Sequence, residues 1–208
     1  MSKKNWIQRQ RSDPYVKKAQ EQGWRARSAF KLLELDDSER LFDKATHVVD
    51  LGAAPGAWSQ VARARLRPGG RIYALDILPM APLEGVAFVQ GDFREAAVLA
   101  EFEAALKASG EIKKLDLVLS DMAPNISGIG PSDQAKSMDL AELALAFAQD
   151  WLETHGVFVV KVFQGAGFDA FLTELRRSFQ SVKSKKPKAS RAESREVYLV
   201  AKGLKRSI

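Results

Sequence analysis

Short apolar runs alternate with longer amphipathic segments along most of the chain from residue 47 onward. The apolar runs are bounded by Gly, Pro and Asp, which is typical of buried parallel strands. The pattern predicts strands at residues 47–51, 71–75, 86–90, 115–120, 157–163 and 194–202, and helices at residues 58–66, 95–108, 133–152 and 168–179. Because parallel strands need crossover helices, this order predicts a doubly wound α/β sheet.

The longest predicted helix, residues 133–152, gathers apolar residues on one face, which we expect to meet the core. These residues are Leu140, Leu143, Ala144, Phe147 and Trp151. The segment KSKKPKASRAE at 183–193 is polar and basic, and it predicts a surface loop. No internal repeat or long linker interrupts the chain, which indicates one main domain.

The composition excludes several classes of site. The 208 residues include no Cys and two His, which excludes a disulfide scaffold, a cysteine nucleophile and a Cys-based metal site and argues against a multi-histidine metal centre. The N-terminal residues lack the apolar core of a signal peptide, and no apolar run is long enough to span a bilayer. We therefore expect a soluble, cytoplasmic protein without a membrane partner.

Positive charge is concentrated at the two ends of the chain. Residues 1–31 carry nine Lys or Arg against two acidic residues, and residues 176–208 carry eleven against two, although the whole chain has a net charge of +6. With aromatic residues interleaved among the N-terminal cations, contact with nucleic acid and a role in solubility stand as equal alternatives. The cations that would meet phosphate are Arg9, Arg11, Lys17, Lys18, Arg25 and Arg27, with a second group at 183–191.

The sharpest motif is DLGAAPGAW at 50–58, which follows a predicted strand and opens a predicted helix. Its glycine spacing is neither the GxGxxG of dinucleotide dehydrogenases nor a Walker loop, and no Lys or Arg lies in 50–62 to meet phosphate. Asp76 and Asp92 follow the next two strands, at the edge where α/β sheets bind ligands. The combination favours an adenosine-type ligand without a pyrophosphate over a glycine turn of purely structural purpose.

Two charged residues lie in or directly after apolar strands. Lys161 is flanked by FVV and VF, and a lysine buried there is costly unless it is paired or neutral. Asp121 ends the strand LDLVLS and would need a buried donor. From residue type alone, Lys31 is a helix-surface lysine and Glu196 is a strand-edge charge.

Six segments then occur in a fixed order between Ser12 and the C-terminus. They are DLGAAPGAW (50–58), LDILPM (75–80), GDF (91–93), SDMAPN (120–125), VVKVFQG (159–165) and SRAESREVYLVA (190–201). Together they resemble the FtsJ/RrmJ (RlmE) family of S-adenosylmethionine-dependent ribosomal RNA 2′-O-ribose methyltransferases. The resemblance implies a Rossmann-like, mostly parallel, seven-stranded sheet with an antiparallel last strand.

The resemblance also implies the residues of the site. The cofactor, S-adenosylmethionine, would be bound by Gly56, Trp58, Asp76, Asp92 and Asp121, and the catalytic set would be Lys31, Asp121, Lys161 and Glu196, with no metal. We expect Lys161 to be the general base for the ribose hydroxyl, with Asp121 fixing its position. Ala57 departs from the family, which commonly has a second glycine there, and its methyl group matters only if the local φ is positive.

The implied function is methylation of a uridine in the A-loop of large-subunit (23S) ribosomal RNA, within the assembled ribosomal particle. The corresponding organisation is a basic N-terminal extension at 1–30 and a methyltransferase domain at 31–208, acting as a monomer. Three alternatives stay open: a related 2′-O-methyltransferase for tRNA or an mRNA cap, a non-enzymatic ribosome-assembly factor, and an NAD-dependent dehydrogenase. The missing GxGxxG disfavours the dehydrogenase.

Overall fold

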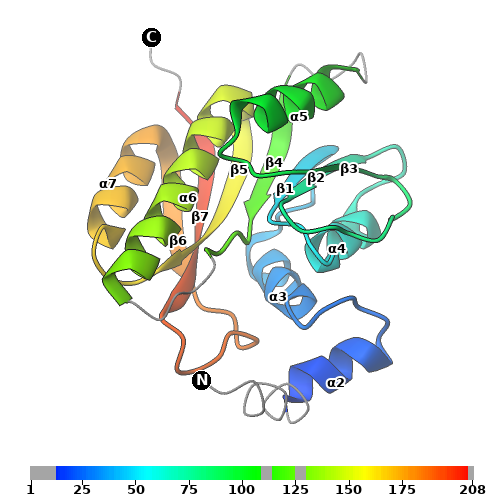
Figure 1. The fold of residues 1–208 in the computed structure, drawn as a ribbon, viewed down its shortest axis with the longest axis horizontal. Helices are drawn as coiled ribbons and strands as arrows, with labels where there is room; N and C mark the ends of the chain where they lie inside the picture. Colours follow the sequence, from blue (N-terminus) through cyan, green and yellow to red (C-terminus); the bar gives the residue numbers. More distant parts are fainter. Residues whose placement is uncertain (1–12, 109–113, 125–129, 206–208) are drawn as a thin grey trace.

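The computed structural model describes residues 13–108, 114–124 and 130–205, which form one open sheet between two layers of helices (Figure 1). The seven strands of the described sheet lie in the order β3-β2-β1-β4-β5-β7-β6. Their bounds are β1 His47–Leu51, β2 Arg71–Asp76, β3 Val86–Gln90, β4 Leu115–Ser120, β5 Leu152–Phe163, β6 Phe179–Lys185 and β7 Glu196–Leu204. β1 to β5 are parallel, and β7 is antiparallel to both β5 and β6, which confirms the predicted fold.

Helices cover both faces of the sheet. α3 and α4 pack on one face, and α5, α6 and α7 pack on the other (Figure 1). The helix bounds are α2 Pro14–Glu21, α3 Ala29–Glu39, α4 Ala57–Arg65, α5 Ala96–Ala108, α6 Gly130–Trp151 and α7 Phe168–Ser178. No helix in the described ranges is long and apolar enough to cross a membrane.

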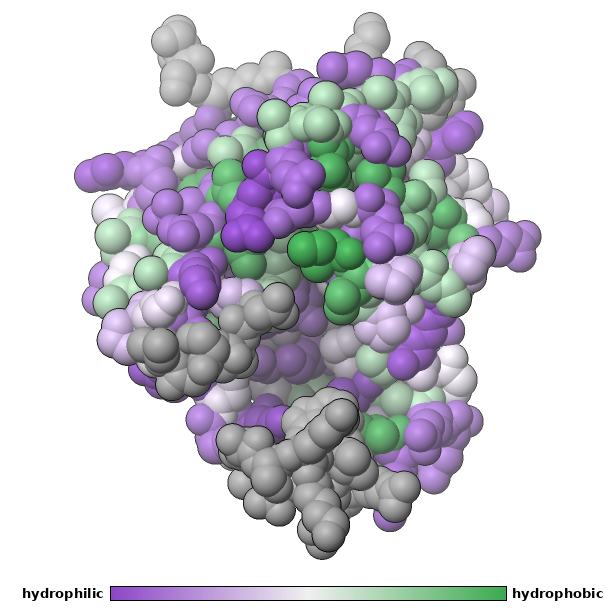
Figure 2. Space-filling model, viewed as in Figure 1, coloured by the Kyte–Doolittle hydropathy of each residue, from purple (hydrophilic) through white to green (hydrophobic). Residues whose placement is uncertain are grey.

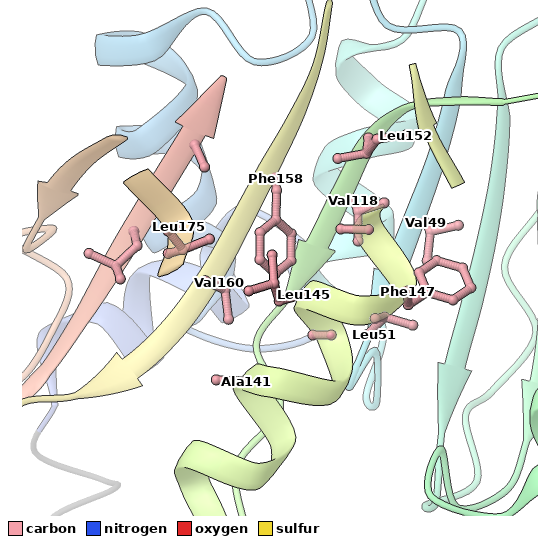
Figure 3. Packing of buried hydrophobic residues seen from close by; sticks show 14 of the residues in the cluster. Val49, Leu51, Val118, Ala141, Leu145, Phe147, Leu152, Phe158, Val160 and Leu175 are labelled. Carbon is pink, nitrogen blue, oxygen red and sulfur yellow. The ribbon is translucent and has the colours of Figure 1, made fainter. Parts of the chain in front are cut away.

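The core between α6 and the sheet corrects one prediction. Figure 3 shows Ala141, Leu145 and Phe147 of α6 against strand residues such as Val118 and Phe158. Leu143, which we expected on this face, is 37% exposed. Ala144 and Phe147 are buried as predicted, and Trp151 packs against the same core. The buried face also includes Ala141, Leu145 and Ala148, so only Leu143 among the predicted residues turns to solvent.

Strand β6 was missed by the sequence pattern. The pattern predicts the end of a helix at residue 179 and a loop from residue 183, but residues 179–185 pair with β7 at the edge of the sheet. An edge strand buries little, and here only Phe179 is buried, so the apolar alternation that marks a strand is weak.

The N-terminal part packs against the body of the protein. Asp13 caps α2 by accepting the N–H of Tyr15 at 3.0 Å, and Pro14 fits the first helical position. Ala19 of α2 is buried with Phe30 of α3 and with Ala189 from the segment between β6 and β7. The first turn of α3 therefore lies beside the segment that leads into β7.

Candidate active site

The carboxyl ends of the parallel strands carry the residues that the sequence predicted for a nucleoside ligand. The 52–56 turn follows β1, Asp76 ends β2, Asp92 follows β3 and Asp121 follows β4. Figure 2 shows that this face is hollowed between the body of the sheet and the part that carries α2, with hydrophilic surface around much of the hollow. In open α/β sheets this edge is where ligands bind.

Asp76 joins the two loops that border this edge. One carboxylate oxygen accepts the N–H of Ala54 at 2.8 Å, and the other accepts the N–H of Leu78 at 2.8 Å. Gly52 and Gly56 in the first loop have φ of +78° and +102°, which glycine adopts without a steric penalty. Each carboxylate oxygen has a second lone pair, so Asp76 can still accept a hydrogen bond from a ligand.

Asp92 is held in place by Arg94. The guanidinium donates to both carboxylate oxygens, at distances of 2.5 to 3.1 Å. These bonds lower the pKa of Asp92 below its ordinary value, so the carboxylate is ionised at neutral pH. It can therefore act as a hydrogen-bond acceptor for a ligand amine.

A second polar group lies where β4, β5 and β7 meet. The Lys161 Nζ on β5 lies 3.0 Å from the Asp121 Oδ1 and donates to the Asp121 backbone carbonyl at 2.5 Å. The Lys161 side chain is only 8% exposed, so the ammonium is held largely out of water with its partner. A charge buried in this way is fixed in position, since leaving the carboxylate would strand it without compensation.

Tyr198 links this pair to a second one. It lies opposite Lys161 in the β5–β7 register, and its hydroxyl donates to the Asp121 Oδ1 at 2.8 Å. Lys31 of α3 donates to the Tyr198 oxygen at 3.3 Å and forms an ion pair with the Glu196 Oε1 at 2.6 Å. The structure thus places the four residues predicted as a catalytic set in one continuous network, with Tyr198 at its centre.

Burial and charge act in opposite directions on the carboxylates of this network. Burial raises the pKa of Asp121, but the charges of Lys161 and Lys31 outweigh it, and the net pKa lies below the usual range. The same balance lowers the pKa of Glu196, where Lys31 is the main opposing charge. Burial, followed by the charges of Asp121 and Glu196, raises the pKa of Tyr198 well above its ordinary value. At neutral pH the carboxylates are ionised and Tyr198 is protonated.

Trp58, predicted to bind the cofactor, lies behind this network. Its side chain is buried in the core, its Nε1 donates to the Ser28 carbonyl at 2.9 Å, and its ring lies 5.6 Å from the Tyr198 ring. It therefore supports Tyr198 by packing and offers little surface to a ligand. Ala57 is the first residue of α4 and lacks a positive φ, so its methyl group sits on helical backbone.

Sequence reasoning did not assign a role to Tyr198. The available signal was its spacing of two from Glu196 in a strand, since residues two apart in a strand face the same side. Once Glu196 is placed at the site, Tyr198 follows it onto the face that meets α3.

Asp50 is a buried carboxylate at the end of β1. The Ser59 hydroxyl donates to its Oδ2 at 2.7 Å, and its Oδ1 has no hydrogen-bond partner among the described residues. Burial first, and then the charges of Asp121 and Asp76, raise the pKa of Asp50 to about 7. The same carboxyl group titrates near ~3.9 in an unfolded chain, so between about pH 4 and pH 7 the folded protein holds a proton on Asp50 that the unfolded chain has lost. The free energy of unfolding therefore falls as the pH rises through this range.

The variant Asp50→Asn is expected to be more stable than the wild type at pH 8, by on the order of 2 kcal/mol, because the amide needs no ionisation. The advantage should shrink at pH 4.5, where Asp50 of the wild type is itself protonated. Urea unfolding of the cofactor-free protein at both pH values measures this difference. An equal difference in unfolding free energy at both would show that Asp50 does not titrate there.

The open sheet with an antiparallel last strand, a glycine turn without phosphate-binding cations, and acids at the strand ends beside a buried lysine define a Rossmann-like methyltransferase. The model of the FtsJ-like methyltransferase family matches residues 24–204. The chain belongs to the FtsJ-like methyltransferase family.

Relatives and solved structures agree with this assignment. The chain is 53% identical over 203 residues to the ribosomal RNA large subunit methyltransferase E of Methylobacillus flagellatus, with 98% of this chain and 95% of the relative covered. It is 52% identical to the protein of that name in Chromobacterium violaceum, with 97% of each covered. A solved structure described as a ribosomal RNA methyltransferase from Plasmodium falciparum is similar with a TM-score of 0.76 and 30% identity, covering 87% of this chain and 98% of that one.

Proposed function

We propose that this protein transfers a methyl group from S-adenosylmethionine to the ribose 2′-hydroxyl of a uridine in the 23S RNA of the large ribosomal subunit. The observation that carries the proposal is the buried Lys161 ammonium, 3.0 Å from Asp121 at the ligand-binding edge of the sheet. The names of the relatives support the choice of RNA. We further propose that the protein is a cytoplasmic monomer acting on the assembled particle, which supplies part of the specificity.

The carboxylates at the strand ends fit this cofactor. When bound, S-adenosylmethionine supplies a methyl group on a positively charged sulfur. Asp76 would accept hydrogen bonds from the ribose hydroxyls, Asp92 would accept one from the adenine amine, and Asp121 carries negative charge toward the sulfonium end. The 50–62 segment has no Lys or Arg that would repel a cation.

The methyl transfer itself is assigned to the polar network around Lys161 and Asp121. A 2′-hydroxyl is a poor nucleophile, so its proton must leave as the new carbon–oxygen bond forms and the carbon–sulfur bond breaks. Lys161 lies where its Nζ would accept this proton once the ammonium has released its own proton to solvent, and Asp121 holds that nitrogen in place. Lys31 and Glu196 are joined to Asp121 through Tyr198, and they orient the ribose from the side opposite Lys161.

Several of the predicted RNA-binding cations already have partners within the protein. Lys183 and Lys185 form ion pairs with Glu39. Arg25, Arg27 and Lys186 donate to backbone carbonyls of the protein. Lys188 and Arg191 take part in no ion pair between described residues. The segment that carries them is nevertheless fixed, because the Glu34 carboxylate accepts the N–H groups of residues 188 and 189 at 2.6 and 3.1 Å. Arg9 and Arg11 lie outside the described residues.

We expect the double variant Lys188→Ala with Arg191→Ala to weaken binding of a single-stranded ribosomal RNA fragment, and to reduce the slope of log affinity against log salt by about 0.7 per cation removed. Fluorescence anisotropy across a salt series measures the slope. Lys107→Ala, a lysine paired with Glu103 on α5, is the control and should leave it unchanged. An unaltered slope in the double variant would place the RNA elsewhere.

The function is tested with labelled S-adenosylmethionine and large ribosomal subunits that lack the modification. Transfer of label to the 23S RNA, mapped to a uridine 2′-oxygen, is the expected result. Label on tRNA or capped RNA instead would favour a related methyltransferase of different substrate. RNA binding without any transfer would favour an assembly factor, and binding of NAD in place of S-adenosylmethionine would favour a dehydrogenase.

A further inference from the structure

Arg25 lies in the segment between α2 and α3, and its guanidinium contacts both loops that border the cofactor edge. Nη1 donates to the Pro55 carbonyl at 3.1 Å and to the Ala81 carbonyl at 2.7 Å, and Nη2 donates to the Pro82 carbonyl at 2.7 Å. Pro55 belongs to the loop after β1, and the other two carbonyls belong to the loop after β2. One side chain from the N-terminal part therefore spans the two loops.

The surrounding residues are arranged to admit this guanidinium. A Cβ at Gly56 would lie 2.6 Å from the Arg25 Nη1 and 2.9 Å from the Met80 Sδ, so the absence of a side chain there makes room for the arginine. The Arg25 backbone N–H donates to the Gln60 Oε1 at 2.8 Å, and the Gln60 Nε2 donates to the Gly23 carbonyl at 2.9 Å. The backbone from Gly23 to Arg25 is thus tied to α4.

The same two loops are also joined by Asp76, through the N–H groups of Ala54 and Leu78. The carboxylate binds N–H groups and the guanidinium binds carbonyls, so the two loops are held together at two places by groups of opposite charge. Asp76 is itself the residue proposed to bind the ribose. The spacing of the loops around it depends on the second tie, which is Arg25.

We propose that Arg25 is a positioning residue for the cofactor, which sets the spacing of the loops after β1 and β2 and thereby preorganises the nucleoside site. The inference rests on the proposed use of S-adenosylmethionine. It assigns Arg25 to the cofactor and not to RNA phosphate, although it lies in a basic segment. The planar fork of an arginine is needed, because a lysine cannot bridge carbonyls of two loops at fixed angles.

The test compares Arg25→Gln and Arg25→Lys with the wild type by isothermal titration with S-adenosylmethionine and, separately, with a ribosomal RNA fragment. Arg25→Gln is expected to weaken cofactor affinity by about tenfold, since preorganisation and charged hydrogen bonds are lost. Arg25→Lys should fail to restore it, and turnover at saturating cofactor should stay near the wild-type rate. The matched control is Arg67→Gln, an arginine that donates to the Asp43 carbonyl away from these loops, which should leave cofactor affinity unchanged.

Other results overturn the inference. Unchanged cofactor affinity in Arg25→Gln, with weaker RNA binding that Arg25→Lys restores, would make Arg25 a phosphate contact. An equal loss of cofactor affinity in Arg67→Gln would mean that the effect of Arg25→Gln is general destabilisation. Thermal unfolding of all variants would reveal this. A wild-type protein that binds no S-adenosylmethionine would instead contradict the proposed function itself.

Discussion

Lys161→Met is expected to slow methyl transfer by a factor of about a thousand or more, while S-adenosylmethionine still binds with nearly wild-type affinity. Methionine keeps the apolar stem of the side chain in β5 but removes the nitrogen that lies 3.0 Å from Asp121. The hydroxyl would then lose both its proton acceptor and the group that positions it. Single-turnover transfer from labelled cofactor, together with cofactor titration, separates the chemical step from binding.

Lys161→Arg sharpens this test. Arginine keeps the positive charge but does not give up its proton, so it should stay inactive if Lys161 is the base and recover part of the rate if only the charge matters. Lys205→Met is the control, because Lys205 also donates to a backbone carbonyl, that of Arg176 at 3.0 Å, but lies beyond the far end of β7. A wild-type rate of methyl transfer in Lys161→Met would contradict the assignment of Lys161 as the general base.

β1 and β4 match their predicted ranges because both lie inside the parallel part of the sheet, where a strand must be apolar along its whole length. β3 also matches, although it is an edge strand with no buried residue, because its apolar run VAFV is followed by Gln90 and Gly91. β6 was missed because only its first residue, Phe179, is buried, and because the carboxylate that its Lys183 meets lies 144 residues away in the sequence. No local pattern carries information about a contact of that separation.

The candidate site also contains residues that the sequence alone could place and residues that it could not. Asp76 and Asp121 could be placed from the sequence alone, because a carboxylate at the end of a buried strand has a defined position. Lys31 and Glu196 looked like surface charges, and only the resemblance to a family brought them to the site. The structure shows the physical reason: α3 crosses over β7, so that a helix surface and a strand start face each other.

The sequence also could not show which cations of the basic N-terminal segment have partners within the protein. Its charge predicts contact with phosphate, yet Arg25 and Arg27 donate to carbonyls of loops far along the chain. Charge counts describe what a segment attracts, but only the fold shows which cations are already engaged. Lys188 and Arg191, in contrast, form no ion pair between described residues, and their contact with phosphate stays a prediction.

Glu39 is the last residue of α3, and its carboxylate pairs with three lysines of β6 and β7. Its carboxylate is 1% exposed and lies 3.0 Å from the Lys183 Nζ, 2.8 Å from the Lys185 Nζ and 3.2 Å from the Lys202 Nζ. Burial raises the pKa of Glu39, but hydrogen bonds from the three lysines outweigh this effect and lower the pKa to about 2. The ionised carboxylate therefore stabilises the fold at any pH above its ordinary value of 4.5.

Glu39→Gln is expected to lower the free energy of unfolding by about 3 kcal/mol at pH 7, because three cations lose their shared counter-charge. The loss should shrink as the pH falls from 4.5 toward 2, since the wild-type carboxylate is then protonated as well. Urea unfolding at pH 7 and pH 3 measures both values. Asp37→Asn on the same helix is the matched control: its partner Arg65 and its own side chain are well exposed, so it should cost little.

The position of Glu39 connects this stability to the site. Lys31 and Glu39 are eight residues apart on α3, about 12 Å along the helix axis, and both meet residues of β7. The ion cluster at one end of the helix therefore anchors the element that presents Lys31 to Tyr198 and Glu196 at the other. If Glu39→Gln unfolded with the wild-type free energy at pH 7, the lysines would be solvated surface charges, and α3 would owe its place to its apolar face alone.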